Sequence, residues 1–261
     1  MPCASADPVR EISGLDRKIM GEKQQAFTST HNCWCLDMGT MGYPEAWDLQ
    51  QALVRAKIKK NLSQDVFLLL EHAPVFTLGR RGGAENLTVP DAFLKESGIQ
   101  VIQVERGGDI TYHGPGQMVV YPILDLDRQR LGITDLVSML EEIMIRISGS
   151  VGVTADRNPR NRGVWVDNKK LGSIGLAVRK GISFHGMALN VNLSMAPFTW
   201  IHPCGLSDIS MTSLEKELSI RPSMQTARKL TKQHLGDVFG LQLEKITRET
   251  LEEVIGLEGS Y

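Results

Sequence analysis

Residues 65–72, DVFLLLEH, contain the apolar run that most constrains the fold. Such a continuous run predicts a strand buried on both faces, because a strand with one wet face would alternate apolar and polar residues. Further strands are predicted within 73–83, at 99–106 and at 118–126, where Pro122 indicates an edge strand or a bulge. Residues 163–193 predict two strands joined by a turn at 167–168, and a third strand after Gly181.

Helical periodicity marks residues 43–60 and 133–151, and two C-terminal helices are predicted within 222–241 and 247–257. The strands therefore come in runs with hairpin signals, and only a few helices lie between them. This order favours an α+β fold, with a mixed, mostly antiparallel sheet flanked by helices, over a doubly wound parallel sheet.

The charge balance excludes some classes of partner. The 261 residues include 29 basic and 30 acidic side chains, for a formal net charge of −1, and no apolar run is long enough to span a bilayer. Nothing therefore points to nucleic acid or membrane. The N-terminus lacks an apolar signal core and carries Asp7, Glu11 and Asp16, so a cytoplasmic protein is expected. Residues 1–30 are predicted to be a flexible segment, and 31–261 a single domain with C-terminal helices.

The four cysteines are Cys3, Cys33, Cys35 and Cys204. This sparse usage does not suggest a disulfide scaffold, and the Cys-Trp-Cys pair at 33–35 lacks the spacing and the partners of a zinc site. Alternation along a strand places both sulfurs of that pair on one face, where two small buried side chains are expected.

Residues 106–117, RGGDITYHGPGQ, form the densest motif, with glycine at 107, 108, 114 and 116. Such glycines let backbone N–H groups approach a ligand closely, although the spacing matches neither a P-loop nor a dinucleotide-binding turn. The interleaved polar side chains are Arg106, Asp109, Thr111, Tyr112, His113 and Gln117. The mixture favours a shaped pocket with an oxyanion-like cradle. The alternative is a pair of tight turns with solvated polar residues.

Two more motifs carry candidate groups. In KKLGSIGLAV (169–178), the small neighbours of Lys170 leave room for an acyl chain, and a desolvated lysine near a thiol would supply positive charge and a proton acceptor. In SFHGMALNVNL (183–193), Met187 suits an apolar pocket or the core, and a structural role is favoured for His185.

Cys204 lies on a bend between Pro203 and Gly205, where a reactive group is readily displayed. Spacing alone does not separate this reading from an inert buried cysteine.

Together and in this order, RGGDITYHGPGQMVVYPI, KLGSIGLAV, SFHGMALNV and PCGLSDISMTSL resemble the lipoyl(octanoyl) transferases, and EHAPVFTLGRR resembles the upstream segment of that family. The resemblance spans about residues 36–218. It implies a fold like the biotin/lipoate protein ligase catalytic domain, and transfer of octanoyl from acyl carrier protein to a lysine of apo lipoyl domains. The acceptors it implies are the lipoyl domains of 2-oxoacid dehydrogenase complexes and the glycine cleavage H protein. No metal or nucleotide cofactor is implied, because the thioester arrives activated.

The resemblance also assigns residues. Cys204 matches the nucleophile that forms an acyl thioester, and Lys170 matches the lysine that lowers its pKa and moves protons. The residues that match substrate-binding segments are Arg106, Gly107, Gly108, Asp109, Ile110, Thr111, Tyr112, His113, Ser173, Ile174, Gly175, Gly186, Met187 and Ala188. His113 is expected to position substrate, with a role as general base the weaker hypothesis.

Two rival functions share the fold: an ATP-dependent lipoate–protein ligase, which would not need Cys204, and a non-catalytic lipoate- or acyl-binding protein. Exposed arginines at 80, 81, 128 and 130 can meet the acidic surface of an acyl carrier protein, or are simply solvated.

Overall fold

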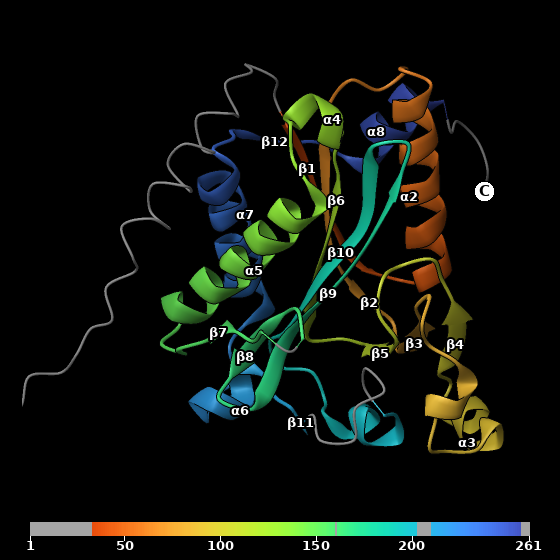
Figure 1. Ribbon diagram of the computed structural model, residues 1–261, viewed down its shortest axis with the longest axis vertical. Helices are drawn as coiled ribbons and strands as arrows, with labels where there is room; N and C mark the ends of the chain where they lie inside the picture. The colour runs from red at the N-terminus through yellow and green to blue at the C-terminus, as the bar shows by residue number, and fades with distance from the viewer. Residues whose placement is uncertain (1–32, 160, 203–209, 257–261) are drawn as a thin grey trace, which may run out of the picture.

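The computed structural model describes residues 33–159, 161–202 and 210–256 (Figure 1). A nine-stranded sheet runs through the molecule in the order β12-β1-β2-β6-β10-β9-β8-β7, with β11 also paired to β9. Its strands are β1 (Cys33–Met41), β2 (Val66–His72), β6 (Gln117–Ile123), β7 (Asp156–Arg157), β8 (Val164–Val166), β9 (Lys169–Arg179), β10 (Ile182–Asn190), β11 (Ser210–Met211) and β12 (Leu243–Lys245).

The predicted mixed, mostly antiparallel sheet is confirmed. Among the described strands of the large sheet, only the pairs β12–β1, β1–β2 and β11–β9 are parallel. A second sheet in the order β4-β3-β5 holds β3 (Val75–Leu78), β4 (Gln100–Gln103) and β5 (Ile110–His113). The turn predicted at 167–168 joins β8 to β9, where Asp167 adopts a positive φ of 52°.

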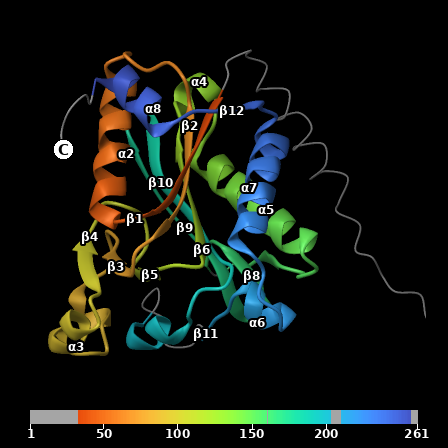
Figure 2. The same ribbon diagram turned by 180° about the vertical axis from the view of Figure 1, so that it is seen from behind.

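Helices cover both faces of the large sheet (Figures 1 and 2). One face carries α2 (Tyr43–Ile58) and α8 (Arg248–Ile255), and the other carries α5 (Ile133–Ser150) and α7 (Met224–Phe239). The shorter helices are η1 (Ala84–Asn86), α3 (Asp91–Glu96), α4 (Leu126–Gln129), η2 (Ala196–Trp200) and α6 (Leu214–Leu218).

Strand β2 explains the apolar run of the sequence. Phe67 and Leu69 pack into the core under α5 and α7, while Leu68 and Leu70 pack into the core under α2. A strand between two helical layers has no wet face, which explains the unbroken apolar run of residues 66–70. Cys33 and Cys35 lie side by side in the core under α5 and α7, as predicted.

Of the two alternatives predicted for Pro122, an edge strand or a bulge, the edge strand is wrong, because β6 lies in the interior of the sheet between β2 and β10. Pairing of β6 with β10 stops at Val120↔Met187 and resumes at the bridge Asp125↔Ile182. In this register Pro122 falls opposite His185, whose φ is 55°, so the proline stands where the ladder is already interrupted.

The two C-terminal helices were predicted, but the strand between them was not. β12 pairs in parallel with β1 and extends the large sheet, and Leu235 and Phe239 of α7 are buried in the core. Three residues are too few for a periodic signal, so this strand is fixed by its partner rather than by its own pattern.

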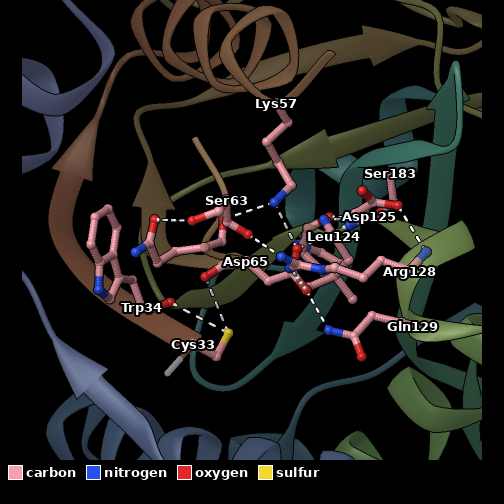
Figure 3. Close-up of polar contacts among 12 residues, drawn as sticks. Cys33, Trp34, Lys57, Ser63, Asp65, Leu124, Asp125, Arg128, Gln129 and Ser183 are labelled. Atoms are coloured by element: carbon pink, nitrogen blue, oxygen red, sulfur yellow. Dashed lines mark hydrogen bonds and ion pairs between the residues drawn. The ribbon is translucent and has the colours of Figure 1, made fainter. Parts of the chain in front are cut away.

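A buried carboxylate, Asp65, ties β2 to its surroundings (Figure 3). Its two oxygens lie 2.7 Å from Lys57 Nζ and 2.8 Å from an Arg128 guanidinium nitrogen, and Gln129 donates a third bond of 2.6 Å. Burial opposes the ionisation of Asp65, but the Lys57 ammonium and hydrogen bonds from Gln129 and the Asp125 main chain hold the pKa of Asp65 below its ordinary value.

None of the helices among the described residues is long and apolar enough to cross a membrane.

Candidate functional site

A cavity of about 650 Å³ opens between the two sheets and the first turn of α5. The sequence motifs converge on it, although they come from β5, β9, β10 and the loop before β5. The predicted site residues that line it are Arg106, Gly107, Gly108, Asp109, Ile110, Thr111, His113, Lys170, Ser173, Ile174, Gly175, Gly186, Met187 and Ala188.

Two predicted residues need separate mention. Tyr112 is not among the lining residues; it packs against Phe76 and Phe198 in a small core beside η2. Cys204 lies outside the described residues, which end at His202 and resume at Ser210 in β11.

The loop before β5 is anchored by Arg106, which is only 7% exposed. The Arg106 guanidinium donates to the Thr77 hydroxyl at 2.9 and 3.1 Å and to the Thr77 carbonyl at 2.7 Å. The next residue, Gly107, donates its N–H to the Leu176 carbonyl of β9 at 2.8 Å. A Cβ at Gly175 would lie 2.9 Å from the Gly107 carbonyl oxygen, so this glycine is what lets the loop close on β9. Arg106 therefore stabilises the wall of the cavity, and its guanidinium is engaged by Thr77.

His113 uses both ring nitrogens within the protein. Nδ1 lies 2.7 Å from Gln117 Oε1, which only accepts, so Nδ1 carries the proton. Nε2 lies 3.3 Å from Thr77 Oγ1, and this hydroxyl is free to donate because it accepts from Arg106. Burial lowers the pKa of His113 well below its ordinary value, and the imidazole is neutral. These bonds suit a positioning role and leave no lone pair for a general base.

Lys170 is the second residue of β9 and is 3% exposed. Its Nζ donates to Asn161 Oδ1 at 2.6 Å and lies 5.4 Å from the centre of the Trp165 ring. On its other side, β11 pairs Met211 with Lys170, and the N–H of Thr212 donates to the Lys170 carbonyl. The chain therefore resumes directly beside Lys170 after the undescribed 203–209.

His185 is buried with a strained backbone (φ 55°). Its N–H donates to Gln50 Oε1, its Nδ1 lies 3.3 Å from the Tyr43 hydroxyl, and burial lowers its pKa. These contacts agree with the structural role predicted for His185, although this residue also borders the cavity.

Sequence reasoning missed several lining residues, chiefly Tyr43, Tyr121, Val137 and Asn161. Tyr43 opens α2 and Val137 belongs to α5, and both were interpreted only as parts of amphipathic helices. No local pattern separates a helix residue that faces a cavity from one that faces the core.

We expect stability to fall in mild acid because of His72. Nδ1 of this buried side chain donates to the Met41 carbonyl, Nε2 accepts from the Tyr121 hydroxyl at 2.7 Å, and burial lowers its pKa from 6.5 to about 4. Between pH 4 and pH 6.5 the His72 side chain is protonated in the unfolded chain but neutral in the folded chain. The contribution of His72 to stability is therefore complete above pH 6.5 and is lost as the pH falls toward 4, by up to roughly 3 kcal/mol.

Urea unfolding at pH 7.5, 6 and 5 measures this decline. His72→Gln should reduce the slope but not abolish it, because burial also lowers the pKa values of His113 and His185. The exposed control His202→Gln should leave the slope unchanged. Equal slopes for the His72 variant and the wild type would contradict the assignment.

The described residues contain no group of three or more His, Cys, Asp or Glu side chains that would hold a metal ion.

Comparison with known proteins gives a consistent result. Residues 42–236 match the lipoyl protein ligase A/B catalytic domain family. The chain is 45% identical over 207 residues to an octanoyltransferase of Desulfotalea psychrophila, covering 78% of this chain and 93% of that protein. It is 41% identical over 220 residues to an octanoyltransferase of Caldicellulosiruptor bescii, covering 84% and 96%.

Solved structures share the fold at much lower identity. A lipoate–protein ligase A bound with ATP superposes with a TM-score of 0.68 at 15% identity, over 87% of this chain and 93% of that one. The bipartite lipoate protein ligase of Thermoplasma acidophilum gives a TM-score of 0.66 at 16% identity, over 87% and 91%. The predicted likeness to lipoate ligase folds is thereby confirmed.

Proposed function

The chain belongs to the lipoyl protein ligase A/B catalytic domain family, and from this we infer that it is an acyltransferase that moves octanoyl groups onto lysines of lipoyl domains. The donor we propose is octanoyl-acyl carrier protein. The proposed acceptors are the apo lipoyl domains of 2-oxoacid dehydrogenase complexes and the glycine cleavage H protein, in the cytoplasm.

One observation carries the mechanism: the Lys170 amine is buried in the wall of a cavity whose other wall is the glycine-rich loop. A cation held out of water favours a nearby thiolate, and we propose Cys204 as that thiolate. The apolar lining residues Val137, Met187 and Leu176 suit an alkyl chain, and main-chain N–H groups of the loop suit the oxygen of a tetrahedral intermediate.

The reaction then proceeds in two acyl transfers, after which the enzyme has returned to its starting state. The Cys204 thiolate attacks the donor carbonyl, the bond from that carbonyl to the phosphopantetheine sulfur breaks, and the departing thiolate takes a proton from Lys170. The acceptor amine next attacks the new thioester, the carbon–nitrogen bond forms, and neutral Lys170 takes the amine proton. The Cys204 thiolate leaves beside a restored ammonium. This route needs no metal or nucleotide, because both acyl donors are thioesters.

Mass spectrometry tests the proposal. After mixing with octanoyl-acyl carrier protein, we expect a single octanoyl adduct, discharged by an apo lipoyl domain without ATP. A requirement for ATP would favour a lipoate–protein ligase instead. An unmodified protein that still binds octanoate would indicate a non-catalytic binder.

The arginines that are candidates for docking the carrier protein differ in their exposure and in their partners. Arg128 is engaged with Asp65, whereas Arg80 and Arg81 are exposed, and Arg81 borders the cavity. Within the described part of the chain, neither Arg80 nor Arg81 has an acidic partner. Both are held in place through their main chain, which bonds to the carbonyls of Arg106 and Gly108. They are therefore available to an acidic partner at the cavity.

We expect Arg80→Glu to raise KM for octanoyl-acyl carrier protein by about tenfold, because rim charges act mainly on encounter. The rate with octanoyl-pantetheine, which has no protein surface, should not change. Arg55→Glu, on the exposed face of α2, is the matched control. Equal KM changes for the two variants, or an equal loss with both donors, would contradict docking at Arg80.

A further inference from the structure

The amine of Lys170 contacts two residues, Asn161 and Trp165, that lie outside the sequence motifs of the proposed active site. Asn161, in the loop before β8, presents Oδ1 to Lys170 Nζ at 2.6 Å. Trp165, in β8, pairs with Lys170 across the strands and places its ring 5.4 Å from the same nitrogen. The Trp165 indole N–H also donates to the Asn161 carbonyl at 3.1 Å, so the two residues form one unit.

The segment that carries Asn161 is held against β9 by contacts with Glu141 of α5. Glu141 of α5, which is 1% exposed, accepts the N–H of Gly163 at 2.9 Å. The same carboxylate lies 3.3 Å from Arg162 and 3.5 Å from Arg157. Gly163 has a φ of 121°, and a Cβ there would lie 2.9 Å from Lys170 Cε and 2.3 Å from the Gly172 carbonyl oxygen. Only glycine allows the loop to come this close to the lysine.

Both contacts favour the charged form of the lysine. The Oδ1 of Asn161 only accepts, and a charged donor gives the stronger bond. The face of the Trp165 ring attracts a cation and has no comparable attraction for a neutral amine. Burial acts in the opposite direction, because it disfavours the ammonium. Asn161 and Trp165 therefore each shift Lys170 toward its protonated form.

We propose that Asn161 and Trp165 are positioning residues that keep Lys170 protonated before acyl transfer begins. The inference rests on the proposed function, in which the Lys170 ammonium stabilises a thiolate and gives the first proton to the departing thiol. Neither residue touches the acyl group in this account, and both act through Lys170.

Competitive labelling with trace acetic anhydride tests the inference on Lys170 itself, because only the neutral amine reacts. The reaction is run from pH 7 to 12 on the full chain, with tandem mass spectrometry to separate Lys170 from Lys169. Asn161→Ala and Trp165→Leu should each move the Lys170 midpoint down by about one pH unit. Asn161→Asp should move it up, and Trp165→Phe, which keeps an aromatic face, should restore most of the wild-type value. Lys169, which pairs with Glu217 and is 41% exposed, is the internal control and should not move.

Opposite shifts for Asn161→Ala and Asn161→Asp would support the inference, since general loosening of the loop cannot move the midpoint in both directions. A Lys170 midpoint that stays the same in both variants would overturn it. The octanoyl adduct is measured on the same wild-type sample. Its absence would count against the proposed function alone, because the labelling profile reports the lysine whether or not transfer occurs.

Discussion

Cys204→Ala is expected to carry no octanoyl adduct and to transfer octanoyl to an apo lipoyl domain at least about a thousandfold more slowly than the wild type, because the covalent route is lost with its nucleophile. The measurement is single-turnover transfer from octanoyl-acyl carrier protein, followed by intact-mass analysis of enzyme and acceptor. Cys204→Ser should be nearly as slow, since a hydroxyl is far harder to ionise than a thiol beside a lysine.

Cys35→Ala is the matched control for the nucleophile. Cys35 is 5% exposed in the core, and burial raises the pKa of its thiol to about 11, so it is protonated at neutral pH. Burial likewise raises the pKa of Cys33. We therefore expect Cys35→Ala to form the adduct as the wild type does. An adduct that persists in Cys204→Ala and disappears in Cys35→Ala would contradict the proposal, because it would identify Cys35 as the nucleophile.

Asp65→Asn is expected to lower the free energy of unfolding by about 3–5 kcal/mol, because it leaves the buried Lys57 ammonium without its counter-charge. Lys57 and Asp65 side chains are each 2% exposed, so water cannot replace the lost partner. Urea unfolding at neutral pH gives the change directly, and a fall of roughly 10 °C in Tm should accompany it.

Two variants make this result specific. Glu215→Gln breaks the exposed pair with Arg221, whose side chain is 69% exposed, and should cost less than about 1 kcal/mol. Lys57→Met combined with Asp65→Asn removes both charges and should recover part of the lost stability. If Asp65→Asn and Glu215→Gln were equally mild, the Asp65 cluster would not be a stabilising centre.

The fold was predictable where a pattern was long. The apolar run of β2 and the periodic helices α2 and α5 correspond to buried elements, because their side chains must match the faces of a layered structure. Pro122 left an edge strand and a bulge open, because a proline lacks the N–H that a regular central strand needs and the sequence does not say which alternative applies. β12 was missed because it gains its identity from pairing with β1.

The candidate site was predictable as a set of motifs but not as an enclosure. Lys170 and the glycine-rich loop stand out by residue type and spacing, and both line the cavity. Asn161 does not stand out, because an asparagine before a strand is ordinary loop chemistry until its partner is known.

The sequence by itself determined the class of fold, the family, and the residue types at the cavity, since periodicity and motif chemistry are local properties of the chain. Only the tertiary structure decided what each charge does. Arg106 is hydrogen-bonded to Thr77, and Arg128 forms an ion pair with Asp65. Lys170 contacts Asn161 and Trp165. These outcomes depend on which distant segments pack together, because burial and partners, rather than residue type, set the charge state and the reach of a side chain.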